Sequence, residues 1–175
     1  MLFLSAIPAF VALGFVDGKI SRFGLSFYLL FSSLAIFAMG ELISAIVYLV
    51  GLGVVVTILI AYLEERWETL SHGYMDTRFK TKLALMTIVW TVAFLVSRQL
   101  AYAVSFSIVS IGLLSIDRRK PLRSIVGLVA VEAATFVILA ELGLFTASTA
   151  LLLSLLAIVG DVIFARLFCP PQMSC

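Results

Sequence analysis

Residues 83 to 116 read LALMTIVWTVAFLVSRQLAYAVSFSIVSIGLLSI, an apolar run that is interrupted only at Ser97-Arg98-Gln99. A single helix over this run would be roughly 50 Å long at about 1.5 Å per residue. The hydrocarbon core of a bilayer is only about 30 Å thick. We therefore predict two helices, over residues 83–97 and 99–116, that are joined by a tight hairpin at Arg98.

The composition of the whole chain indicates a membrane environment. Of the 175 residues, 63% are hydrophobic and 13% are charged, with a mean hydropathy of +1.20, whereas soluble domains carry about 25% charged residues. The basic residues occur in a few clumps between long uncharged runs. Solid apolar runs are typical of helices, because the strands of a membrane barrel would show alternation. We expect an all-α, polytopic integral membrane protein.

Seven transmembrane helices are predicted from the apolar runs. They cover residues 2–16, 23–39, 41–63, 83–97, 99–116, 121–142 and 146–168. With the N-terminus outside, every Lys and Arg except Arg98 would lie in a cytoplasmic segment, among them Lys82 and the cluster that begins at Arg118. This distribution follows the positive-inside rule. The C-terminus would then be cytoplasmic.

No motif for a standalone active site occurs in the chain. His72 is the only histidine and lies in the hydrophilic segment 64–82, where a solvated side chain is expected. Cys169 and Cys175 lie in the C-terminal tail, and their spacing does not indicate a metal site. The basic stretch 118–123 is too short and too close to a span to indicate nucleic-acid binding. We expect a chain that is not catalytic alone and that holds no metal or cofactor.

Two acids inside apolar runs are the main candidate functional residues. Glu132 lies eleven residues into the span 121–142, close to the bilayer midplane, where an ionised acid costs about 2.5–3.5 kcal/mol even on the lenient insertion scale. Asp161 lies about four residues shallower, or ~6 Å in height. The two acids could therefore face one another or share a water. We expect Glu132 to bind and release protons, with a structural hydrogen bond to a neighbouring helix as the alternative, and for Asp161 both roles stay open.

Two further acids and one irregular stretch extend the candidate site. Glu41 and Glu141 fall near the outer ends of the third and sixth spans, as interfacial charges or as members of the same proton path. Gly51 and Gly53 straddle the centre of the third span, directly after Tyr48. Glycine there permits a close helix contact or a break in the helical hydrogen-bond pattern, so a packing notch and a functional bulge both stay open. Tyr48 is either a packed aromatic or a hydroxyl in a polar relay.

The stretch FSIVSIGLLSIDRRKPLRSIVGLVAVEAATFVILAELG resembles the first two helices of the K-type small membrane subunit of respiratory complex I. The same family includes subunits of multisubunit cation/proton antiporters and membrane-bound hydrogenases. The matching elements are Ile111-Gly112-Leu113, the pair Arg118-Arg119, Gly127-Leu128 and the intramembrane Glu132. The resemblance implies that Glu132 is the first of the two membrane carboxylates of that family, which are thought to carry protons along the membrane arm.

Residues 13–65 resemble the first three helices of the J-type subunit of the same complexes. That family carries a Val-Tyr-x-Gly signature in its third helix, where a switch between α-helix and π-bulge is proposed to gate water access. Val47-Tyr48 matches the signature, with Gly51 one residue further along. The resemblance thus implies a helix gate or bulge at Tyr48, Gly51 and Gly53.

Together the resemblances imply a J-like membrane half, residues 1–97, joined to a K-like membrane half, residues 98–168, with a cytoplasmic tail at 169–175. The chain would be a small membrane-arm subunit of a complex I-like oxidoreductase or antiporter-type complex in the prokaryotic plasma (inner) membrane. Its partners would be other membrane-arm subunits, including large antiporter-like chains, and the lipid bilayer, but no nucleic acid. Quinone, Fe–S clusters or other redox centres would be held by partner subunits.

Two other functional classes stay open. A self-contained secondary transporter should show internal repeats with paired broken helices around a midplane site. A purely structural membrane scaffold would tolerate the loss of both Glu132 and Asp161.

Overall fold

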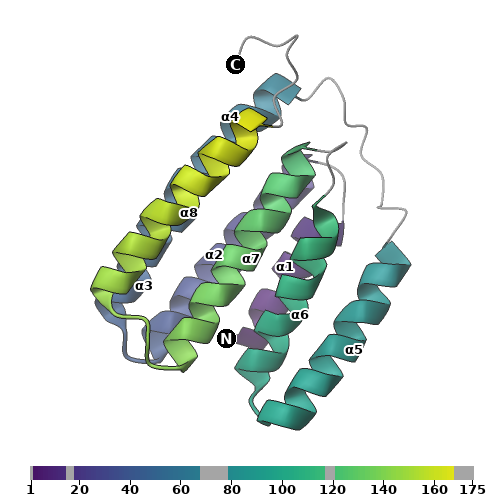
Figure 1. Cartoon of the computed structure of the whole chain (residues 1–175), viewed down its shortest axis with the longest axis vertical. Coiled ribbons are helices and arrows are strands. Elements are labelled where there is room, and N and C mark those ends of the chain that lie inside the picture. The colour runs from purple at the N-terminus through teal and green to yellow at the C-terminus, as the bar shows by residue number, and fades with distance from the viewer. Residues whose placement is uncertain (1, 15–17, 68–78, 117–120, 168–175) are drawn as a thin grey trace.

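The computed structural model describes residues 2–14, 18–67, 79–116 and 121–167, and within these ranges it contains helices and no strand. Their bounds are α1 (Leu2–Gly14), α2 (Gly18–Ala38), α3 (Leu42–Tyr48), the π-helix η1 (Leu49–Val55), α4 (Val56–Trp67), α5 (Phe79–Ser97), α6 (Leu100–Ser115), α7 (Pro121–Glu141) and α8 (Ala147–Leu167) (Figure 1). Because α3, η1 and α4 follow one another without a gap, they form one rod, called the third rod below. The prediction of an all-helical chain is confirmed.

Four segments are long and apolar enough to cross a membrane. They are Leu42–Tyr62, Phe79–Ser97, Leu122–Glu141 and Ala147–Leu167, whereas the apolar helices Arg22–Ala38 and Leu100–Ser115 are shorter. Large apolar side chains such as Leu95, Val96 and Leu156 are exposed on the bundle, and so much exposed apolar surface is unusual in a soluble monomer. These features support a membrane protein, while the count of seven spans and the orientation stay predictions.

The hairpin predicted at Arg98 is present. Helix α5 ends at Ser97 and α6 begins at Leu100, and the two helices pack against each other. Arg98 has a φ of 55°, in the left-handed region that few residues other than glycine adopt. The backbone N–H of Gln99 donates to Ser97 Oγ at 3.2 Å. The short polar interruption therefore forms a tight turn, which returns the chain along the bundle.

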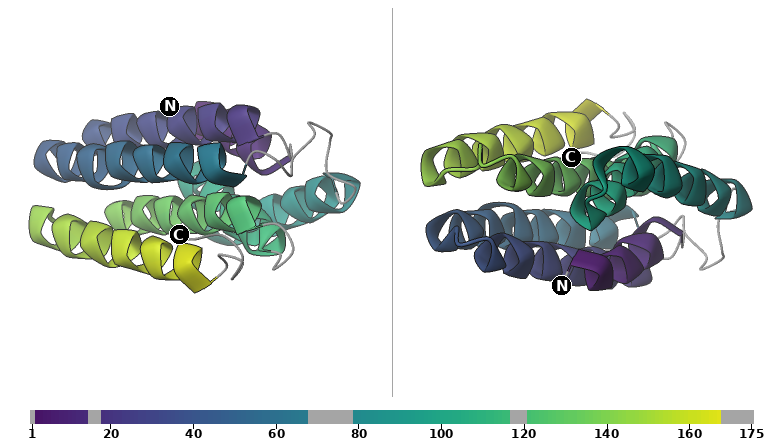
Figure 2. Two further views of the ribbon diagram at one scale, coloured as in Figure 1. Left: turned by 90° about the horizontal axis from the view of Figure 1, so that it is seen from above. Right: turned by 90° about the horizontal axis from the view of Figure 1, so that it is seen from below.

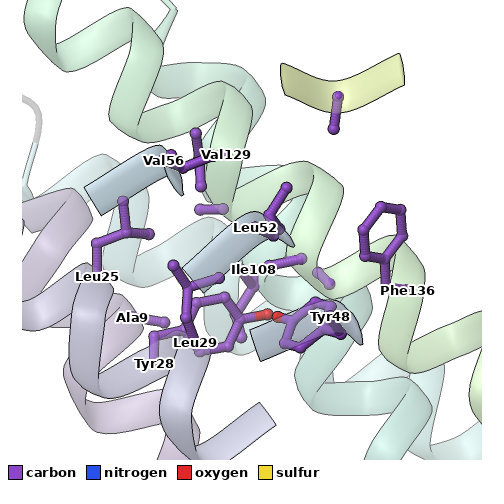
Figure 3. Close-up of a cluster of buried hydrophobic side chains, with 14 of the residues drawn as sticks. Ala9, Leu25, Tyr28, Leu29, Tyr48, Leu52, Val56, Ile108, Val129 and Phe136 are labelled. Atoms are coloured by element: carbon purple, nitrogen blue, oxygen red, sulfur yellow. The ribbon is translucent and has the colours of Figure 1, made fainter. Parts of the chain in front are cut away.

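The helices form two layers of three rods each (Figure 2). One layer holds α1, α2 and the third rod, and the other holds α6, α7 and α8. Across the interface α1 packs on α6, α2 on α7, and α3 on α8. Helix α5 packs mainly on α6, at the edge of the second layer. The core lies between the layers, in a cluster that includes Leu25 and Leu29 of α2 and Val129 of α7, with Val129 beside Val56 of the third rod (Figure 3).

Glycines let neighbouring helices touch at the backbone in both layers. A Cβ atom on Gly24 of α2 would lie 2.7 Å from the backbone N of Ala12 in α1. A Cβ atom on Gly127 of α7 would lie 2.7 Å from the carbonyl oxygen of Gly112 in α6. Small residues at helix crossings allow the close approach on which packing in membranes depends. Each layer is therefore held by a crossing that has no room for a methyl group.

The α6–α7 crossing yields a stability prediction. Gly127→Ala should destabilise the fold by about 1–3 kcal/mol, the usual cost of overpacking a tight contact, because the added methyl group meets backbone. Gly160→Ala on α8 is the matched control, since a Cβ there has no atom within 4 Å. Thermal unfolding in detergent should show a lower Tm for Gly127→Ala alone. Equal Tm values for the two variants would contradict a close backbone contact at Gly127.

Candidate functional site

A π-helix lies in the middle of the third rod. It spans Leu49–Val55 and includes both Gly51 and Gly53, directly after Tyr48. π-Helical turns are rare and occur frequently at functional sites. The break in the α-helical pattern that the two glycines permit is therefore present in this structure. Its role as a gate stays a prediction.

A side-chain hydroxyl of α4 forms a hydrogen bond with the C-terminal part of the π-helix. Thr57 Oγ1 donates to the carbonyl oxygen of Gly53 and lies 3.5 Å from Ser26 Oγ on α2. A change from π to α pattern leaves backbone carbonyls without their regular partner, and a buried unpaired carbonyl is costly. The carbonyl oxygen of Gly53 also accepts from the backbone N–H of Val56, so Thr57 adds a second hydrogen bond there and links the irregular segment to the neighbouring helix.

The π-helix is also the place where the third rod leaves α8. Helix α3 and η1 pack on α8, whereas α4 packs on α7 and α2. At the point of separation Gly51 lies against Ser154 of α8, because a Cβ on Gly51 would lie 2.9 Å from Ser154 Cβ. Gly51 is therefore a packing notch as well as part of the π-helix.

Tyr48 lies fully buried between aromatic rings and hydroxyl groups. Its ring makes edge contacts with Phe136 of α7 at 5.7 Å and with Phe145 at 6.5 Å between centroids. Its hydroxyl points toward that of Tyr28 on α2 (Figure 3), and Ser32 lies beside both hydroxyls. Among the described residues, Tyr48 Oη and Ser32 Oγ make no hydrogen bond of good geometry. Tyr48 is thus both a packed aromatic and a member of a buried hydroxyl cluster.

Glu132 and Asp161 lie near each other on adjacent helices of the second layer. Asp161 of α8 is fully buried, and neither carboxylate oxygen has a hydrogen-bond partner in the described part of the chain. Glu132 of α7 is partly exposed, but its Oε2 atom is buried and also lacks such a partner. The two carboxylates are close enough for their charges to interact. The structure therefore brings together the two acids that sequence reasoning singled out.

The hydroxyl cluster and the carboxylates lie on the same two helices. Phe136, which contacts Tyr48, follows Glu132 by one turn of α7, or ~6 Å. Ser154, which contacts Gly51, precedes Asp161 by two turns on the buried face of α8, or ~10 Å, and Ser154 Oγ also lacks a partner among the residues described. Buried polar atoms thus continue from the π-helix toward the carboxylates.

Glu41 and Glu141 lie at one end of the bundle, apart from the carboxylate pair. Glu41 is exposed before α3, and its Oε2 atom accepts a hydrogen bond from Ser44 Oγ at 3.1 Å. Ser44 Oγ is also 3.2 Å from the carbonyl oxygen of Phe145. Glu141 is partly exposed at the end of α7, ~13 Å along the helix from Glu132. The structure does not bring these two acids to the pair, and their part in a proton path stays a prediction.

Lys82 is an important polar residue that sequence reasoning misplaced. Lys82 was expected in the hydrophilic segment 64–82, but it lies within α5 and is only 1% exposed, while its cytoplasmic side stays a prediction. Its Nζ donates to the carbonyl oxygen of Leu13 at 2.8 Å and to Ser115 Oγ at 2.7 Å. These acceptors lie in the last turns of α1 and α6, where the helix dipole favours a cation. A lysine that adjoins a span has no sequence signal to distinguish this role from a topology charge.

Metal-binding chemistry finds no candidate cluster in this structure. Among the described residues, no three His, Cys, Asp or Glu side chains come together. His72, Cys169, Cys175 and the tail 169–175 lie outside the described residues. No family model, curated protein or solved structure matches this chain. The candidate site consists of the carboxylate pair Glu132 and Asp161 and the π-helix Leu49–Val55.

Lys82 yields a second stability prediction. Lys82→Met should destabilise the fold by about 3 kcal/mol or more, because hydrogen bonds to charged groups contribute roughly 1.5–3 kcal/mol each. Lys80→Met, on the exposed side of the same helix turn, is the control and should be neutral. Resistance to unfolding in a titration with a denaturing detergent measures both. A Lys82→Met variant as stable as the control would show that the buried ammonium is dispensable.

Proposed function

We propose that this chain is a small membrane subunit of a larger ion-translocating complex, of the complex I-like oxidoreductase or antiporter type. In this proposal Glu132 and Asp161 pass protons within the bundle. The observation that carries the proposal is the carboxylate pair itself, whose three buried oxygens lack hydrogen-bond partners in the described chain. Ionisable groups at membrane depth are rare and mark ion or proton paths, and a structural acid would be expected to have a partner.

The chemistry follows from the cost of charge in an apolar bundle. One ionised acid near the centre of a membrane costs about 2.5–3.5 kcal/mol or more, and a second negative charge nearby adds Coulomb repulsion. The pair is therefore best suited to carry one negative charge and one proton between its two carboxylates. A proton that arrives at Glu132 can move to Asp161, directly or through a water, while a second proton leaves.

The π-helix would control access of water to this pair. If η1 became α-helical, the hydrogen-bond register would change, and Gly51 and the following α4 would rotate relative to Ser154 and α7. The buried hydroxyls of Tyr48 and Ser154 lie at the contacts that would change. Gly51, Gly53 and Tyr48 are thus assigned to a gate, and the carboxylates to the proton transfer.

The remaining parts of the complex would come from other chains. Large antiporter-like subunits are the proposed membrane partners, in the plasma membrane of a prokaryote with the N-terminus outside. Quinone, Fe–S clusters or other redox centres would lie on partner subunits, and the residues of this chain would only move protons.

Removing a carboxylate charge should slow the proposed proton transfer. Glu132→Gln and Asp161→Asn should each lower proton translocation roughly 100-fold or more, because a positioned proton-transfer group typically contributes 10²–10⁴-fold. Lys80→Gln is the control, since it removes an exposed charge on α5, which packs mainly on α6. The assay is proton uptake by vesicles that contain the assembled complex. Unchanged proton uptake in both carboxylate variants would contradict a proton-transfer role for Glu132 and Asp161 and would favour a structural scaffold.

The secondary-transporter alternative predicts a pair of broken helices. The third rod contains a π-helix, but α8, which occupies the matching place in the second layer, is α-helical throughout Ala147–Leu167. This asymmetry favours a subunit over a self-contained transporter. Purification in a mild detergent distinguishes the two, because a transporter would migrate as a small homogeneous particle and a subunit with large membrane partners.

The contact between Gly51 and Ser154 allows a compensation test of the gate. Gly51→Ala should slow proton translocation severalfold, because its methyl group meets Ser154 and overpacking costs about 1–3 kcal/mol. Adding Ser154→Gly should restore most of the rate, because it removes the atom that the methyl group meets. The same vesicle assay measures both variants. Failure of the second substitution to restore the rate would separate this contact from gating.

A further inference from the structure

The two layers of the bundle repeat one three-helix pattern. Helices α2 and α7 are both 21 residues long, and in each the seventh residue is the glycine of the crossing, Gly24 or Gly127. Each helix is followed by a turn with a glycine in the left-handed region, Gly40 at φ 94° and Gly143 at φ 68°. Aligned from their first residues, α2 and α7 can therefore be compared position by position.

The second layer is related to the first by a translation perpendicular to the layers, without a rotation that would reverse the order of the rods. Each rod packs on its own counterpart, α1 on α6, α2 on α7 and α3 on α8 (Figure 2), whereas a two-fold axis would place α1 against α8. Such a contact joins two different faces and is heterologous, so each layer keeps one face that the other layer does not cover. The uncovered face of the second layer corresponds to the covered face of the first.

Burial along α2 and α7 follows this stacking. Four residues of α2 are buried inside the bundle, Leu25, Leu29, Ser32 and Ile36, and their counterparts on α7 all have exposed surface: Leu128, Glu132, Thr135 and Leu139. Conversely, Val126, Ala130, Ala133, Val137 and Ala140 of α7 are buried, and their counterparts Phe23, Phe27, Leu30, Leu34 and Phe37 of α2 are exposed. We name Leu128, Glu132, Thr135 and Leu139 the open α7 face.

We propose that the open α7 face is the docking surface for a membrane helix of a different chain. In the first layer the same positions of α2 lie in the buried core, to which α7 contributes Val129, Ala130, Ala133 and Ala134. Lipid is a poor cover for the face, because the carboxylate of Glu132 lies at its middle and a charge against hydrocarbon is costly. The face therefore calls for a helix with small contact residues and a polar group opposite Glu132.

A second copy of this chain does not meet that requirement. Continued stacking would bring the exposed side of its α2 onto the open α7 face, and that side carries Phe23, Phe27 and Phe37. Three phenyl rings offer no hydrogen-bond donor to Glu132 and replace the small residues that permit close helix contact. The fitting partner is a helix with small residues along its contact stripe and a basic or hydroxyl side chain opposite Glu132.

Site-specific photocrosslinking in native membranes tests this surface. A benzophenone amino acid is placed at Thr135 on the open α7 face, with Leu34 on the opposite, outward side of α2 as the matched control. The Thr135 probe should form an adduct with a second membrane chain, and the linked peptide should lie in an apolar helix with a basic or hydroxyl residue within one turn. The Leu34 probe should give at least tenfold less of that adduct.

Several results would overturn the proposal. They are adducts of Thr135 with lipid only, adducts with another copy of this chain, a linked helix without a donor, or equal yields from Thr135 and Leu34. A Thr135→Trp variant gives a second measurement, because it should remove the partner from the purified complex while Leu34→Trp retains it. Retention of the partner by both variants would count equally against the surface.

This inference rests on the proposed assembly into a larger complex, but not on proton transfer. If Thr135 links to a partner helix and Glu132→Gln leaves translocation unchanged, docking stands and the proton path falls. If Glu132→Gln stops translocation and Thr135 links only to lipid, the proton path stands and this docking surface falls.

Discussion

The backbone contact between Gly112 and Gly127 sets the rotation of α7, and the functional geometry depends on that rotation. With Gly127 against α6, Val131 also faces α6, because its Cγ2 atom would lie 2.6 Å from a Cβ on Gly112. The next residue along a helix is turned by about 100°, so Glu132 lies on a different side of α7 from the α6 contact, where its charge interacts with that of Asp161. The position of Glu132 relative to Asp161 thus depends on a helix crossing at which two glycines meet through their backbones.

The third rod shows how a local irregularity changes helix partners. All three parts of the rod pack on α2, but α3 and η1 also pack on α8, whereas α4 packs on α7. Gly51 touches Ser154 at the point of separation, and Thr57 binds the carbonyl of Gly53 beyond it. In an apolar setting a rod tolerates an irregular segment where local backbone hydrogen bonds and hydroxyl side chains satisfy its polar groups. The irregular segment therefore lies among hydroxyl groups and next to the acids.

Charge is handled differently at the two buried sites. Lys82 has hydrogen-bond acceptors at the ends of two helices and ties α5 to both layers. Asp161 lacks any such partner in the described chain and has a second acid nearby. A satisfied buried charge stabilises a structure, whereas an unsatisfied one is maintained at a cost in stability. This contrast separates a structural role for Lys82 from the proposed role of the carboxylate pair.

The sequence by itself determined the helical class, the turn at Arg98, the place of Glu132 in the middle of its helix and the presence of glycines after Tyr48. These features are local, since they depend on the length of apolar runs, the rise per residue and the residues that interrupt them. Only the tertiary structure decided that Lys82 is buried, that Ser154 meets Gly51, that Glu132 and Asp161 adjoin, and which face of α7 stays open. Helices that are apolar on all sides carry little information on their own rotation, so contacts between side chains on different helices are decided by packing.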